Sequence, residues 1–253
     1  MNMLGQTLVV CEKEVRSMMH NPSERLFRLI KPMLWLLLFG SVIKMPGMTS
    51  GVDYKQFMLP GILIHTVLVT AIGHGITLKW EADVGILSRM LVAPIRRTSI
   101  VLGKALSSVA KTYMEVGVFL VLAWILGIQF HCDVFTLSFT AAVVAIFVIG
   151  ISSLGMALAI LLRTREAYTG VVGLVATPSL FASNSLYSLN QMPQWLRTIA
   201  SVNPVTYAVD SIRRILTYGS FEATPILTDL LVTVLFSAAI LACTVVVFRR
   251  IGQ

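Results

Sequence analysis

Six long runs of apolar residues constrain this chain more than any other feature of its sequence. A helix of about 20 predominantly apolar residues spans the ~30 Å hydrocarbon core of a bilayer. Only 13% of the residues are charged, about half the share in a typical soluble domain. The sequence therefore predicts an all-α membrane protein with six transmembrane helices, at roughly 29–45, 58–78, 105–126, 136–162, 167–183 and 227–248.

Lysine and arginine are distributed unevenly over the segments between these runs. With the N-terminus in the cytoplasm, the inner segments hold 14 of the 20 basic residues, the outer segments hold 5, and Lys111 lies within a run. The positive-inside rule favours this orientation, which also puts the C-terminus in the cytoplasm. The basic residues are scattered over four inner segments without interleaved aromatics, so the net charge of +8 does not indicate nucleic-acid binding.

The chain is expected to be a single transmembrane domain over residues 1–253, and three of its segments lie outside the runs. In the first, residues 1–24, apolar side chains recur at helical spacing at Leu4, Leu8, Cys11 and Val15. This pattern favours an amphipathic helix in the cytoplasmic interface of the bilayer over a short soluble tail.

The second segment is an inner loop at 79–98. It contains an apolar set that a short helix would align on one face, ended by Pro94; the set is Ile86, Leu87, Met90 and Leu91. Glu81, Asp83 and Arg89 stay polar. Such a helix would dock on a cytoplasmic partner, whereas the alternative is a solvated connector, and the residues alone leave both interpretations open.

The third segment, 184–225, lies on the outer side. Asn203 precedes Pro204, which is the typical start of a helix with an N-cap and a first-turn proline. An apolar stripe follows, and Asp210 lies at pairing distance from Arg213 or Arg214 along a helix. We expect outer helices on or partly within the outer leaflet, with Trp195 in the headgroup zone.

The sequence lacks the motifs of several enzyme classes. It has no phosphate-binding loop, since Gly103 and Lys104 are followed by Ala105, and it has no HExxH or GxSxG motif. The four histidines are not spaced as metal ligands. We therefore expect no ATP site, metal, cofactor or catalytic residue in this chain.

Glu115 is the acid that lies deepest within an apolar run. A charge at the bilayer centre costs roughly 2.5–3.5 kcal/mol or more, so such a residue faces protein or water. Either Glu115 contacts the substrate path or the coupling machinery, or it pairs with Lys111, one helical turn away.

Three groups of residues resemble the ABC-2 type permeases, the membrane subunits of ABC exporters, and the drug-resistance (daunorubicin) branch in particular. The resemblance covers nearly the whole chain. The inner group is Glu81, Gly85, Leu87, Leu91 and Pro94; the outer group is Pro193, Trp195, Leu196, Asn203, Pro204, Tyr207, Asp210 and Arg213; and Phe57, Pro60 and Gly61 open the second run. The chain departs from the family at 182–185, where many members have Ser-Gly.

The resemblance implies a fold of six membrane helices with an N-terminal interface helix and two short outer helices. It also implies an assembly in the cell membrane of two permease subunits with two ATP-binding subunits, which hold the ATP and Mg²⁺. The coupling helix that contacts the ATPase would comprise Glu81, Asp83, Gly85, Leu87, Arg89, Leu91 and Pro94.

An apolar or amphipathic cargo is expected, because the runs contain few charges that would hold a hydrated ion. Export of a polysaccharide or a lipid-linked glycan by the same architecture is the alternative. A secondary transporter driven by an ion gradient would need more intramembrane acids and a repeated half, and the sequence shows neither.

Overall fold

The computed structural model describes residues 3–18, 30, 32–38, 53–86, 90, 92 and 97–250, and these residues form helices and short connections without strands. The elements are α1 (Met3–Met18), α3 (Tyr54–Asp83), α5 (Arg97–Ile125), α6 (Val134–Leu161), α7 (Arg165–Phe181), a 3₁₀ turn (Leu189–Gln191), α8 (Gln194–Val202), α9 (Pro204–Leu216) and α10 (Ala223–Arg250). The predicted all-α membrane fold is confirmed.

Within the described part of the chain, α3, α5, α6 and α10 are long and apolar enough to cross a bilayer. They match four of the six predicted runs. The fifth run corresponds to α7, whose 17 residues reach about 25 Å, near the lower limit for a span. Most of the first run lies outside the described residues, although 32–38 are helical. The count of six spans stays a prediction.

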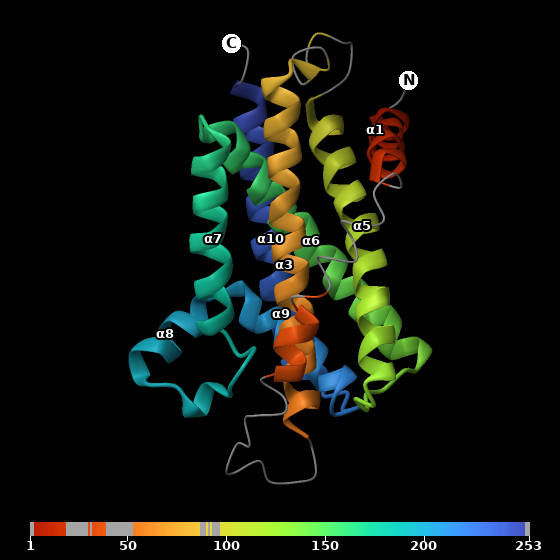
Figure 1. Ribbon diagram of the computed structural model, residues 1–253, viewed down its shortest axis with the longest axis vertical. Helices are drawn as coiled ribbons and strands as arrows, with labels where there is room; N and C mark the ends of the chain where they lie inside the picture. Colours follow the sequence, from red (N-terminus) through yellow and green to blue (C-terminus); the bar gives the residue numbers. More distant parts are fainter. Residues whose placement is uncertain are drawn as a thin grey trace.

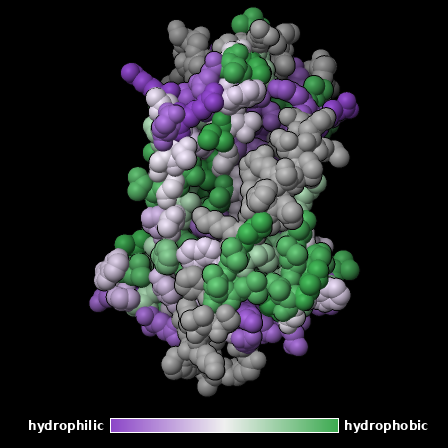
Figure 2. Space-filling view, in the orientation of Figure 1, coloured by the Kyte–Doolittle hydropathy of each residue, from purple (hydrophilic) through white to green (hydrophobic). Residues whose placement is uncertain are grey.

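The long helices run along the long axis of the molecule, and the shorter elements gather at its two ends (Figure 1). The helix α1 lies beside α5 at the end that also contains the C-terminal part of α10, and we call this the α1 end. The helices α8 and α9 lie at the opposite end, the α9 end. On the face in Figure 2, hydrophilic residues gather at both ends and hydrophobic ones lie between them, as a bilayer requires.

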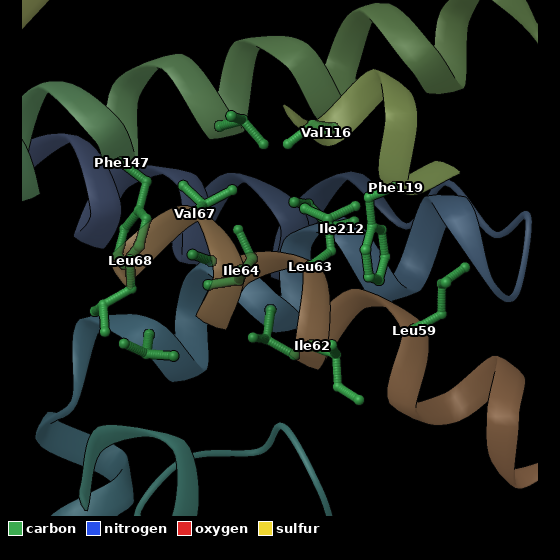
Figure 3. Close-up of a cluster of buried hydrophobic side chains, with 14 of the residues drawn as sticks. Leu59, Ile62, Leu63, Ile64, Val67, Leu68, Val116, Phe119, Phe147 and Ile212 are labelled. Carbon is green, nitrogen blue, oxygen red and sulfur yellow. The ribbon is translucent and has the colours of Figure 1, made fainter. Parts of the chain in front are cut away.

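The core of the bundle is built around α3, which packs against α5, α6, α7 and α9. Figure 3 shows Leu63, Ile64 and Val67 of α3 meeting apolar side chains of the neighbouring helices. Helices in lipid associate through close packing because water-driven association is absent there. Gly75 illustrates this: a Cβ at this position would lie 2.3 Å from the carbonyl oxygen of Gly155 in α6.

Candidate functional site

Four charged side chains meet at the α1 end, and we call them the inner ion cluster: Lys13 and Glu14 of α1, Glu81 of α3 and Lys104 of α5. The Nζ atom of Lys104 lies 2.8 Å from Oε1 of Glu14 and 2.6 Å from Oε2 of Glu81. The Nζ atom of Lys13 lies 3.3 Å from the other oxygen of Glu81. Two acids and two bases therefore balance one another.

Three side chains of the inner ion cluster are buried, so each of these charges depends on its partner. Glu14, Glu81 and Lys104 are each no more than 6% exposed, and a buried charge that loses its partner is strongly destabilising. The cluster thus fixes α1 against α3 and α5. Gly103 allows the close approach, because a Cβ there would lie 2.7 Å from the Cβ of Val10.

The predicted coupling residues differ in their exposure. Glu81 belongs to the last turn of α3, which continues to Asp83, so its side chain is buried against α5 instead of lying on the surface of a loop. Asp83 is exposed, and its Oδ2 atom lies 2.8 Å from Nε of Arg165 in the first turn of α7. Gly85 follows the end of the helix with a φ of 77°, a left-handed conformation that favours glycine.

The rest of the predicted coupling helix lies outside the described residues. This applies to Leu87, Arg89, Leu91 and Pro94. The structure does describe both ends of the segment that contains them, since α3 ends at Asp83 and α5 begins at Arg97. The amphipathic coupling helix within this segment stays a prediction.

A second network lies at the α9 end around Arg213, which is 3% exposed. Its guanidinium donates to the carbonyl oxygens of Phe57 (3.3 Å) and Asn184 (2.5 Å), and to Oδ1 of Asp210 (3.1 Å). Its central carbon lies 4.0 Å from the ring centroid of Phe57. The amide of Asn184 also donates to Asp210. We call Phe57, Asn184, Asp210 and Arg213 the outer arginine cluster.

Two side chains at the end of α9, Thr217 and Arg213, contact backbone carbonyls beside a proline in α3. Pro60 has no N–H, so the carbonyl of Gln56 loses its helical donor. The hydroxyl of Thr217 donates to this carbonyl at 3.2 Å, and Arg213 donates to the carbonyl of the next residue. The end of α9 is therefore attached to the first turns of α3. Burial raises the pKa of Asp210, although Arg213 and Asn184 oppose the rise.

Asn203 caps α9, as its sequence context predicts. Its Oδ1 atom accepts from the backbone N–H of Val205 at 3.0 Å, and Pro204 occupies the first helical position. Its Nδ2 atom also donates to the carbonyls of Ser179 (3.1 Å) and Ala182 (2.7 Å), where α7 ends. One side chain therefore makes hydrogen bonds with backbone groups at the start of α9 and at the end of α7.

The remaining outer residues hold α8 and α9 together. The hydroxyl of Tyr207 in α9 donates to the carbonyl of Ser201 in α8 at 2.6 Å. Pro193 immediately precedes α8, and Trp195 is exposed on that helix, as a headgroup anchor requires. Asn184, within the segment 182–185, supplies the carbonyl and the amide that contact Arg213 and Asp210.

Glu115 lies inside the bundle and is 3% exposed. Its Oε2 atom accepts a hydrogen bond from the hydroxyl of Thr70 in α3, at 2.5 Å. Sequence reasoning did not identify Thr70, because its link to Glu115 depends on how α3 and α5 are aligned. The ion pair between Glu115 and Lys111 stays a prediction.

Comparison with known proteins identifies the family. The family model for the ABC-2 type transporter matches residues 5–217. This chain belongs to the ABC-2 type transporter family. Permeases of this family are membrane proteins that lack an ATPase site of their own and work with ABC ATPase subunits. The predicted resemblance is confirmed.

Individual relatives of this ABC-2 permease cover most of its length. The putative transport permease ycf38 of Cyanophora paradoxa is 32% identical over 202 residues, which is 76% of this chain and 68% of that protein. The daunorubicin resistance ABC transporter permease protein DrrB1 of Streptomyces coeruleorubidus is 24% identical over 215 residues, 84% of this chain and 75% of that protein. Nodulation protein J of Rhizobium leguminosarum bv. trifolii is 26% identical over 198 residues, which is 74% of this chain and 72% of that protein.

Proposed function

We propose that this chain is the permease subunit of an ABC exporter that moves a lipophilic or amphipathic small molecule out of the cell. A separate ATPase subunit binds ATP and Mg²⁺ and supplies the energy. The distribution of Lys and Arg puts the α1 end in the cytoplasm and the α9 end outside. The assembly has two permeases and two ATPase subunits, in the cell membrane.

The observation that carries this proposal is the set of ion pairs around the segment between α3 and α5. The inner ion cluster joins α1, α3 and α5 on one side of it. On the other side, Asp83 joins α3 to α7 through Arg165. An ATPase that displaces this segment would therefore move four helices together, as a rigid-body transition requires.

The helix α3 extends this effect across the membrane. Its 30 residues reach about 45 Å at 1.5 Å per residue, longer than the hydrocarbon core. Glu81 and Asp83 hold one end, whereas Arg213 and Thr217 hold the other end to α9. A push at the cytoplasmic end of α3 is thus transmitted to the outer helices, where the path would open.

Reconstitution with an ATPase tests this function. The permease is co-expressed with a candidate ABC ATPase subunit from the same organism, and the copurified complex is placed in proteoliposomes. Daunorubicin is the first probe because it is fluorescent and amphipathic, and because the name of one relative refers to resistance to it. We expect transport that depends on ATP and stops with an ATPase variant that binds but does not hydrolyse ATP. Transport by the permease alone, or driven by an ion gradient, would contradict the proposal.

A further inference from the structure

Polar residues form a matched pair of stripes where α3 faces α5. On α3 they are Thr70, His74, Thr77 and Glu81, and on α5 they are Lys104, Ser108, Lys111 and Glu115. Both sets have the spacing i, i+4, i+7, i+11, which places four residues on one face of a helix. We call these eight residues the polar seam.

Two contacts fix the alignment of the polar seam. Thr70 donates to Glu115 at 2.5 Å, and Lys104 lies 2.6 Å from Glu81. The two contacts are eleven residues apart on each helix, so one antiparallel register satisfies both. That register places His74 at the level of Lys111 and Thr77 at the level of Ser108. The seam therefore leads from the inner ion cluster to Glu115 deep in the bundle.

Two residues of the seam, Ser108 and Glu115, have a buried polar atom without a hydrogen-bond partner. In the part of the chain that the structure describes, Oε1 of Glu115 and Oγ of Ser108 are buried and make no hydrogen bond. Thr77, at the level of Ser108, is exposed. A buried polar atom within a membrane protein is normally satisfied by protein, water or a ligand. A carboxylate oxygen in this position accepts a hydrogen bond from water or from an N–H or O–H group of a ligand.

The seam ends at Glu115. One residue further along α5, Val116 belongs to the apolar core, as does Phe119 one turn from Glu115. Figure 3 shows Val116 and Phe119 among Leu63 of α3 and Ile212 of α9. The polar stripe therefore ends at the buried ion pair of Glu81 and Lys104 toward the α1 end, and it meets tightly packed apolar side chains toward the α9 end.

We propose that the polar seam becomes a water-accessible path from the cytoplasmic side to Glu115 when the inner ion cluster separates, and that it receives the polar head group of an amphipathic cargo. The head group carries N–H or O–H donors, because Glu115 offers an unpartnered carboxylate oxygen. The apolar part of the cargo stays in the surrounding lipid. The assignment of a cargo rests on the proposed export function, whereas water access does not.

Thiol labelling tests the water-accessible path. The natural cysteines 11, 132 and 243 are replaced by serine, and single cysteines are introduced by Thr77→Cys and Ser108→Cys in the permease–ATPase complex. Leu106→Cys is the matched control, because Leu106 is an exposed apolar residue on α5, two positions from Ser108 and away from the seam. Val116→Cys tests the closed end. The probe is trimethylammonium-ethyl methanethiosulfonate, a membrane-impermeant cation, applied to the cytoplasmic face.

We expect the two seam cysteines to react on the order of a hundredfold faster than those at 106 and 116, because a cation reaches a lipid-facing or packed site only at high cost. Equal rates at 106 and 108 would overturn the proposed path. Daunorubicin should slow labelling at 108 several-fold, and Glu115→Leu should abolish that protection while labelling itself continues. Fast labelling without protection would overturn the head-group assignment alone. Normal labelling and protection in a complex that transports nothing would instead contradict the export function.

Discussion

The two ends of this permease are held together by networks of different chemistry. In the inner ion cluster, side chains pair with side chains: Lys104 contacts Glu14 and Glu81. In the outer arginine cluster, Arg213 donates mainly to backbone carbonyls, those of Phe57 and Asn184. Carbonyls are fixed by the backbone that carries them, whereas carboxylates on rotatable side chains can exchange partners.

This difference assigns different mechanical roles to the two ends. Arg213 and Thr217 donate to the carbonyls of Phe57 and Gln56 beside Pro60, and Gln56 has lost its helical donor, so these contacts are expected to persist through the transport cycle. The inner ion cluster can rearrange without exposing backbone groups. We therefore expect contacts between helices to change first at the α1 end, while α3 and α9 stay joined at the α9 end and move together. The following predictions test this comparison.

The largest loss of stability is expected from Arg213→Met. The change leaves Asp210 as a buried charge and removes the donors to two carbonyls. Breaking a buried pair by removing one partner costs about 3–5 kcal/mol. Thermal unfolding of the purified permease in detergent should show this, with Arg214→Met as the control because Arg214 is partly exposed. Adding Asp210→Asn to Arg213→Met should restore part of the stability. Equal stability of the two single variants would contradict the central role of Arg213.

Lys104→Met is expected to destabilise the permease somewhat less, by about 3 kcal/mol. Glu14 loses its cation, but Glu81 keeps Lys13. The matched control is Lys13→Met, whose side chain is half exposed, so its loss should be much smaller. Limited proteolysis should also cleave α1 earlier in Lys104→Met than in the control. If the two variants unfold at the same temperature, the cluster does not fix α1.

Asn203→Ala removes a helix cap and two donors at the end of α7. Loss of an N-cap costs about 0.5–2 kcal/mol, and we expect a value near the upper limit because the carbonyls of Ser179 and Ala182 lose their donors too. Asn203→Asp separates these contributions, since aspartate keeps the cap oxygen but cannot donate. It should therefore unfold between the wild type and Asn203→Ala. An Asn203→Asp variant as unstable as Asn203→Ala would show that the cap contributes nothing.

The parts of this structure that depend on local sequence could be predicted, and those that depend on register could not. The start of α9 follows from Asn203 and Pro204, which are adjacent and carry their own geometry. The contact between Glu14 and Lys104 joins residues 90 positions apart and exists only because α1 packs beside α5. The sequence around Glu14 or Lys104 does not indicate which residue it contacts.

The position of Glu81 shows the same limit within a single segment. Its polar neighbours suggested a surface loop from residue 79, but α3 continues through Asp83, so Glu81 remains on a helix and faces Lys104. The apolar run predicted the part of α3 that lies within the hydrocarbon core, but it did not predict that the helix continues to Asp83. The spacing of polar residues across α3 and α5 was present in the sequence, and it became interpretable once Thr70 and Glu115 fixed the register.

The smallest effect on stability and the most specific effect on function are expected at Asp83. Its pair with Arg165 is exposed to water, and its second pair, with Lys79 at 3.7 Å, lies within α3, so Asp83→Arg should lower the melting temperature only slightly. The change nevertheless separates the end of α3 from α7, and we expect ATP hydrolysis by the complex to continue while transport falls. The double variant Asp83→Arg with Arg165→Asp recreates the pair with its charges exchanged and should recover transport. Recovery would show that the link between α3 and α7 matters for coupling, whereas a double variant as defective as the single one would assign Asp83 a direct contact with the ATPase. If Asp83→Arg alone transports normally, movement is not transmitted through this pair, and the inner ion cluster would be the remaining connection between the coupling segment and the bundle.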